Sequence, residues 1–182
     1  MKAMTLCLFL FCGAVSAAEE TFNIDPDHTH PSFEFSHMGI SVWRARFNKT
    51  SGTVTLDRAA KTGSVEIRVD AASVDFGHRT MNEVALTGDW LNVERFPVMR
   101  YRGPIVFEGD VPVAVEGQLS LLAATQAVRL KINSFNCMTH PLSRREVCGA
   151  DAEGDFNRAD FGMKQYREGE KIHLRIQVEG IK

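Results

Sequence analysis

The chain has 182 residues, in which 21 Lys and Arg stand against 23 Asp and Glu, giving a formal net charge of −2. This balance has no basic excess, which argues against nucleic acid or an anionic membrane surface as the partner. The length suits one domain with a sizeable core.

The N-terminus predicts export. Lys2 precedes an apolar run over residues 4–15, which is too short to span a bilayer, and the small residues Ser16 and Ala17 follow it. This pattern is typical of a secretory signal peptide, so we predict a signal peptide over residues 1–17 with cleavage after Ala17. The remaining chain, 18–182, is expected to be one domain in the periplasm, with no further segment long enough to span a membrane.

Apolar and polar residues alternate with a period of two along most of this domain, as expected for antiparallel strands with one buried face. The alternating segments are 32–37, 53–57, 65–69, 99–102, 105–107, 111–121, 128–132 and 172–179. Short turn signals separate them, among them a Gly-Pro turn predicted at Gly103-Pro104. So many one-sided strands indicate a barrel or a sandwich, and closure is favoured because an open sheet would leave two unpaired edges.

Residues 78–97 break the alternation. Met81, Val84, Ala85 and Leu91 are spaced more like one face of a helix, and the segment ends before Pro97. We predict one or two short helices here, covering a side or an end of the barrel.

Only two cysteines, Cys137 and Cys148, lie outside the predicted signal peptide. A pair in an exported protein indicates a disulfide, which for a loop of this length stabilises the fold by about 3 kcal/mol. A zinc site would need more ligands than His140 supplies, and a redox pair more often has CxxC spacing. We therefore predict a disulfide that braces one end of the barrel.

Two groups of polar residues are candidates for chemistry. Asp25, Asp27, His28 and His30 are close enough in sequence to bind a metal or act as acid and base, or simply to form a polar turn before the first strand. His37 is two residues beyond Phe35 and four beyond Phe33, so in a strand its side chain points to the same side as theirs. It is either a core histidine or a polar group that contacts a ligand inside a cavity.

Several stretches together resemble the YceI family of exported lipid- and polyisoprenoid-binding proteins. They are FNIDPDHTHPSFEFSHMGISVWRARF (22–47), GHRTMNEVALTGDWLNVERFP (77–97), VEGQLSLLAATQAVRLKI (115–132) and NRADFGM (157–163). The resemblance implies an all-β fold, an eight-stranded antiparallel lipocalin-like barrel with an isoprenoid lipid in its lumen. It implies a binding protein rather than an enzyme, with no cofactor or metal and a polyprenyl or ubiquinone-like lipid as ligand.

Carried over to this chain, the resemblance assigns the cavity lining to inward-facing strand residues. They are Phe33, Phe35, His37, Trp43, Phe47, Val65, Ile67, Val69, Met99, Tyr101, Leu119, Leu130, Ile132 and Ile176. It also implies that Phe161 closes the barrel wall, with Asp160 and Arg158 in a polar contact.

Three functional hypotheses follow. The leading one is a periplasmic carrier for an isoprenoid lipid, which could exchange its ligand with a membrane protein that uses quinone. The alternatives are a small barrel enzyme that uses Asp25, His28 and His30, or His37, and a partner protein of the cell envelope. A homodimer is left open by the sequence.

Overall fold

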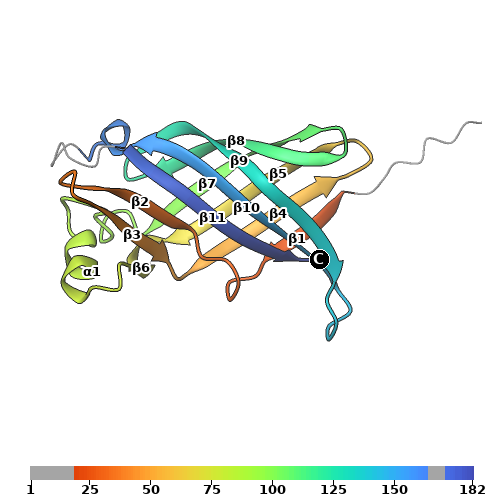
Figure 1. The fold of residues 1–182 in the computed structure, drawn as a ribbon, viewed down its shortest axis with the longest axis horizontal. Helices are drawn as coiled ribbons and strands as arrows, with labels where there is room; N and C mark the ends of the chain where they lie inside the picture. The colour runs from red at the N-terminus through yellow and green to blue at the C-terminus, as the bar shows by residue number, and fades with distance from the viewer. Residues whose placement is uncertain (1–18, 164–170) are drawn as a thin grey trace, which may run out of the picture.

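The computed structural model describes residues 19–163 and 171–182, so the predicted signal peptide over residues 1–17 lies outside the described part. Eight strands form a closed antiparallel barrel, because the first strand pairs with the fourth on one side and with the last on the other. Figure 1 shows this ring as a long tube. The predicted eight-stranded barrel is confirmed. In order around the ring, its strands are β1 (Glu20–Ile24), β4 (Thr50–Asp57), β5 (Thr62–Asp70), β7 (Val98–Glu108), β8 (Val111–Leu121), β9 (Ala124–Thr139), β10 (Glu146–Asn157) and β11 (Lys171–Ile181).

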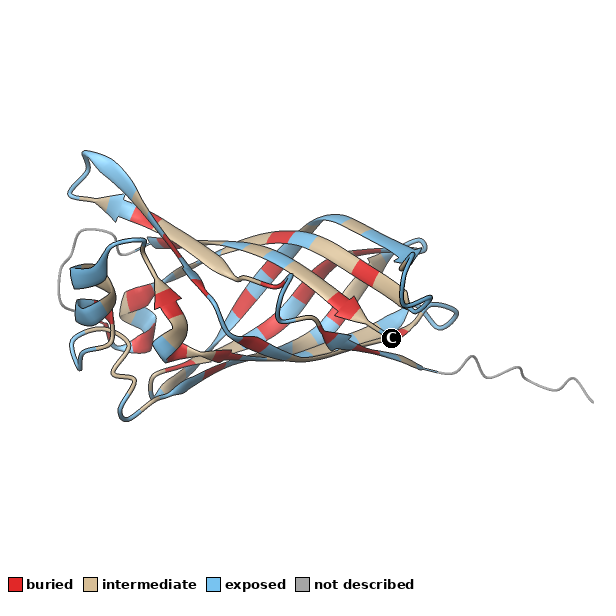
Figure 2. Cartoon of the chain, turned by 90° about the horizontal axis from the view of Figure 1, so that it is seen from below, coloured by how far each residue is buried: buried red, intermediate tan, exposed pale blue. Residues whose placement is uncertain are grey.

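Three further strands extend the sheet from β11: β2 (Ser32–His37), β3 (Ser41–Phe47) and β6 (Val74–Asp75). β2 pairs with β11 only at residues 32–34, whereas it pairs with β3 along its whole length. The outer half of the β2–β3 hairpin therefore leaves the barrel, and Figure 2 shows its exposed tip standing away from the wall.

The predicted helical segment contains one α-helix, α1 (Arg79–Ala85), and continues as turns up to β7. The helix begins after His78, whose Nδ1 accepts a hydrogen bond from the backbone N–H of Met81. Figure 1 places α1 at one end of the barrel, as expected from the sequence. Two short 3₁₀ helices, η1 (Ala71–Ser73) and η2 (Arg158–Phe161), were not predicted.

The predicted turn at Gly103-Pro104 is wrong, because β7 runs through both residues and pairs with β5 at each of them. Gly103 is needed there for close approach of two strands. A Cβ atom at this position would collide with the backbone of Glu116 and Gly117 on β8.

Two β-bulges change which residues point into the barrel. Val106 is opposite Ala114 but Phe107 is opposite Pro112, so β8 carries one extra residue between them. In β9, Ile132 is opposite Ala152 and Ser134 is opposite Asp151, which again leaves one extra residue. An extra residue reverses the inward and outward parity of everything beyond it.

Candidate ligand-binding cavity

A cavity of about 230 Å³ runs inside the barrel, partly open to the surface and lined almost entirely by apolar side chains. Its wall extends from Cys148 and Gly180 at one end to Phe156 and Trp90 at the other. Each barrel strand contributes, because alternate residues of a strand point to the same face. An elongated apolar space of this kind suits a chain-like hydrophobic ligand.

Twelve of the fourteen predicted lining residues lie in the wall of this cavity. They are Phe33, Phe35, Phe47, Val65, Ile67, Val69, Met99, Tyr101, Leu119, Leu130, Ile132 and Ile176. Their contact with a ligand stays a prediction.

His37 and Trp43 are not in the cavity wall. Both sit on the part of the hairpin that has left the barrel, where their rings stack on each other with centroids 4.4 Å apart. His37 follows the parity of Phe33 and Phe35 along β2, but the strand has moved out of the wall by that point. The expectation that these two residues line the lumen is therefore corrected.

Sequence reasoning missed several wall residues, for identifiable reasons. Phe135 and Pro112 lie in the wall because the bulges in β9 and β8 reset the parity of those strands. Phe22 belongs to β1, which is too short to show a pattern, and Trp90 follows the helix. The surplus of Phe, 12 residues against two Trp and two Tyr, was the available signal.

Polar groups buried in the described part of the chain are few, and they also lie in the cavity wall: Thr29, Thr50 and Arg158. Thr29 is held by the backbone of Glu179, to which it donates and from which it accepts a hydrogen bond. The guanidinium of Arg158 lies 5.6 Å from the centre of the Trp90 ring. These groups could meet the polar end of a ligand.

Tyr101 has its own partners inside the wall. Its hydroxyl donates to the carbonyl oxygens of Val128 at 2.8 Å and Val115 at 3.3 Å. Burial raises the pKa of the phenol well above its ordinary value, so it stays a neutral hydrogen-bond donor.

A cluster of four charged residues closes one end of the barrel. The Arg58 guanidinium contacts Glu146 at 2.9 Å and Glu20 at 3.5 Å, and the Lys182 ammonium contacts Glu20 at 2.7 Å and Glu146 at 3.8 Å. The hydrogen bond from Lys182 lowers the pKa of Glu20, and the same bond raises the pKa of Lys182. The cluster therefore connects the start of β1, the start of β10, the end of β11 and the β4–β5 turn.

Beneath this charged cluster the cavity ends in fully buried side chains. Phe22 and Leu56 are each only 1% exposed, and the Arg58 guanidinium lies 5.8 Å from the centre of the Phe22 ring. Ligand entry through this end would require the ion pairs to separate.

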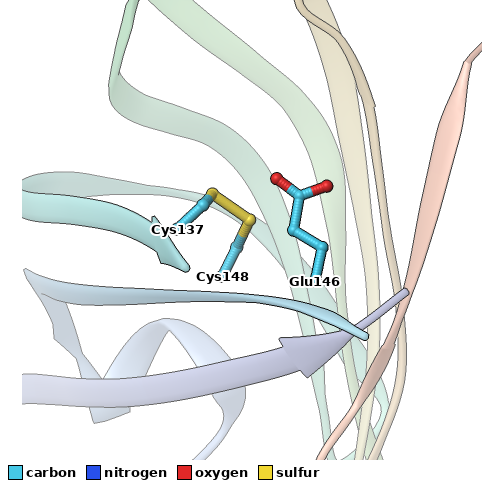
Figure 3. Close-up of side chains that lie close together, drawn as sticks. All are labelled: Cys137, Glu146 and Cys148. Atoms are coloured by element: carbon cyan, nitrogen blue, oxygen red, sulfur yellow. A yellow bond between two sulfur atoms is a disulfide. The ribbon is translucent and has the colours of Figure 1, made fainter. Parts of the chain in front are cut away.

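The predicted disulfide between Cys137 and Cys148 is confirmed and lies at the same closed end. The two cysteines face each other directly across β9 and β10, with Cα atoms 4.0 Å apart. Figure 3 shows Glu146 beside the bond, and Arg58 lies 3.6 and 3.4 Å from the two sulfur atoms. Cys148 is also a wall residue, so the bond lies next to the cavity, and its bracing role stays a prediction.

The opposite end of the cavity is built from aromatic rings that are less buried. The ring centroid of Phe35 lies 6.4 Å from that of Phe76 and 6.2 Å from that of Trp90, which are both wall residues, and 6.3 Å from that of Trp43, which lies outside the wall. Phe76 and Trp90 are half-buried, unlike the residues under the charged cluster. We therefore place the mouth of the cavity here, between the β2–β3 hairpin and α1.

The candidate catalytic group lies on the outside of the barrel. His28 Nδ1 is 2.8 Å from Asp25 Oδ2, and this hydrogen bond lowers the pKa of Asp25 and raises that of His28. The His28 side chain is 60% exposed, and none of Asp25, His28 and His30 lies in the cavity wall. Asp25 also accepts from the backbone N–H of Asp27, as expected for a polar turn.

The fold and the cavity define the chain as a closed antiparallel β-barrel with an apolar interior. In the described residues, no helix has the length and apolar character needed to cross a membrane. The YceI-like domain model matches residues 22–180, so the chain belongs to the YceI-like family.

Relatives and solved structures agree with this assignment. A UPF0312 protein of Shewanella denitrificans is 29% identical over 173 residues, covering 93% of this chain and 90% of its own. Protein YceI of Salmonella arizonae is 26% identical over 185 residues, covering 100% and 96%.

Among solved structures, the fold is similar to Burkholderia cenocepacia BcnA, with a TM-score of 0.68 and 19% identity over 86% of this chain and 98% of that one. It is also similar to a polyisoprenoid binding domain from Saccharophagus degradans, with a TM-score of 0.61 and 12% identity over 88% and 97%.

Proposed function

We propose that the protein is a periplasmic carrier that holds an isoprenoid lipid, polyprenyl or ubiquinone-like, in its barrel. The observation that carries the proposal is the long apolar cavity, closed at the charged end and bordered by aromatic rings at the other. Each methylene of a ligand buried in such a wall contributes about 0.8 kcal/mol before ordering costs. The family membership and the similarity to a polyisoprenoid binding domain support the same ligand class.

The head group of the ligand would lie near the mouth, where donors are available. Thr50 is 4% exposed, and its Oγ1 has no hydrogen-bond partner within the described residues. A quinone or alcohol oxygen placed beside it would accept a hydrogen bond from the hydroxyl and remove the penalty of an unpaired buried group. Arg158, also buried in the wall, would be a second donor.

Lipid extraction tests the proposal. The protein is purified from the cell envelope, extracted with organic solvent and analysed by mass spectrometry, and the emptied barrel is offered a ubiquinone and a polyprenol. We expect one isoprenoid lipid per chain and re-uptake in the same ratio. A barrel that is always empty and takes up neither lipid would overturn the carrier function.

Thr50→Val gives the matched test of head-group contact, because it removes the hydroxyl at nearly constant volume. We expect quinone affinity to fall by about fivefold, the effect of losing one hydrogen bond of about 1 kcal/mol. Envelope fractionation and N-terminal sequencing of the same preparation test the periplasmic location and the cleavage after Ala17. Transfer of the ligand to a quinone-using membrane protein would complete the carrier role.

A further inference from the structure

The tip of the β2–β3 hairpin exposes large apolar side chains that nothing in the barrel requires. Met38 is 61% exposed, Ile40 is 82% exposed and Val42 is 48% exposed. The seven residues from His37 to Trp43 include no Asp, Glu, Lys or Arg. We call residues 37–43 the hairpin tip.

The backbone of the hairpin tip forms a tight turn. Met38 has a φ of 54° and Gly39 a φ of 70°, and the N–H of Ile40 donates to the carbonyl of His37 at 3.1 Å. A left-handed conformation is ordinary for Gly but uncommon for Met. Among the other residues, Asn and Asp adopt it more readily than Met does. Positive φ also occurs at Lys61 and Leu122 in other turns of the barrel, so the backbone alone does not set Met38 apart. What distinguishes Met38 is an apolar side chain that is 61% exposed and is not needed for packing within the barrel.

The hairpin tip is continuous with the mouth of the cavity. From the stacked pair of His37 and Trp43, ring contacts lead to Phe35, then to Phe33 at 6.3 Å and on to Phe47 at 5.6 Å. Phe35, Phe33 and Phe47 all lie in the cavity wall. A continuous row of aromatic rings therefore connects the base of the hairpin tip, at His37 and Trp43, with the barrel interior.

We infer that the hairpin tip docks the protein on a lipid bilayer, with Met38 and Ile40 in the interfacial region and the cavity mouth held against the membrane. This inference rests on the proposed lipid ligand, which a membrane must supply or receive. Trp43 lies three residues from Ile40, roughly 10 Å along an extended strand. That spacing matches an apolar insertion of about 5–10 Å with an indole at the level of the head groups.

The charges around the hairpin tip favour an apolar contact over an electrostatic one. Glu34, the acidic residue of β2, pairs with Arg44 of β3 at 2.9 Å and with Arg175 of β11 at 3.3 Å. Each arginine therefore has an ion-pair partner within the sheet, which leaves one net positive charge in this group of three, while the hairpin tip itself contains no Asp, Glu, Lys or Arg. Docking should need no anionic lipid and should change little with salt, and it should be weak and reversible because few side chains insert.

Flotation with pure phosphatidylcholine vesicles tests this inference on the processed chain, with its N-terminus verified so that the apolar residues 4–15 are absent. The test variant is Met38→Ser/Ile40→Ser. The matched control is Met138→Ser/Leu142→Ser, which changes two equally exposed apolar residues at the closed end of the barrel. Thermal melting confirms that both variants fold.

We expect the vesicle partition coefficient of the hairpin variant to be at least tenfold lower than that of the unchanged protein. The partition coefficient of the control variant should equal that of the unchanged protein. Equal binding by the hairpin variant, a larger loss in the control, or binding that appears only with anionic vesicles would overturn the inference. The inference would also be overturned if the protein does not bind vesicles and instead forms dimers through the hairpin tip.

The same variants separate this inference from the proposed function. Isoprenoid lipid offered in detergent should enter the hairpin variant as readily as the unchanged protein, whereas uptake from vesicles should slow at least tenfold. If the unchanged protein floats with the vesicles but takes up no isoprenoid lipid, the carrier function is overturned and the docking role is not. Normal uptake from vesicles by the hairpin variant would overturn the docking role alone.

Discussion

The aromatic ring of Tyr101 on β7 lies directly over Gly117 on β8 and leaves no room for a Cβ atom at position 117. Gly117→Ala would push the ring out of place while its hydroxyl is bonded to Val115 and Val128. We expect the free energy of unfolding, measured in urea, to fall by about 1–3 kcal/mol, the usual cost of overpacking.

A double-mutant cycle identifies the clash as the cause. In a Tyr101→Ala background, Gly117→Ala should cost much less, because the ring is gone. Gly149→Ala is the control, since a Cβ there would meet other atoms only at ordinary contact distances. Equal losses for Gly117→Ala with and without the Tyr101 ring would show that the contact does not matter.

Reduction of the Cys137–Cys148 disulfide should destabilise the barrel. The bond closes a loop with a sequence separation of 11, which corresponds to about 3 kcal/mol of stabilisation in the chain-entropy model. Urea unfolding with and without reductant measures this, and the Cys137→Ala/Cys148→Ala variant should unfold at one urea concentration under both conditions. An unmoved midpoint, once thiol titration shows both cysteines free, would contradict the bracing role.

Polarity inside the wall should control lipid retention. Ile67 lies in the cavity wall, whereas the adjacent Glu66 is exposed on the outer face of β5. Ile67→Gln places an amide against the ligand at a cost of about 1–3 kcal/mol. We expect retention of bound isoprenoid to fall at least fivefold for Ile67→Gln and to be unchanged for Glu66→Gln. Matching retention in the two variants would place the ligand elsewhere.

Acid should weaken the seam between β2 and β11. Burial alone would raise the pKa of Glu34, but hydrogen bonds from Arg175 and Arg44 outweigh it and lower the pKa. A lowered carboxyl pKa contributes stability above the unfolded value, which is about 4.3, and this contribution is lost as the pH falls through the folded value. The stability difference between the unchanged protein and Glu34→Gln should therefore shrink from pH 6 to pH 3. A difference that stays constant would remove Glu34 from the acid response.

Much of the barrel could be predicted because strand alternation is a local property of the sequence. Val65, Ile67 and Val69 point into the cavity as their parity requires, since β5 pairs with its neighbours without a bulge. Phe135 and Pro112 could not be placed, because each lies beyond an extra residue that is visible only when the partner strand is known. Parity holds only as far as the pairing is regular.

The prediction that His37 and Trp43 line the cavity failed for a different reason. His37 continues the pattern of Phe33 without interruption, and no local signal shows that β2 stops pairing with β11 after Glu34. Conversely, the disulfide was predictable, because it depended only on having two cysteines in an exported chain. The alternation of apolar and polar residues does not show where a strand leaves its sheet.

The ring is closed by the pairing of β1 with β11. Asn23 of β1 pairs with Ile181 of β11, and Lys182 bonds to Glu20. The barrel therefore cannot close until β11 has paired with both β1 and β10. Before that step the apolar inner faces of the other strands are open to solvent, and exposed surfaces of this kind favour aggregation of a folding chain.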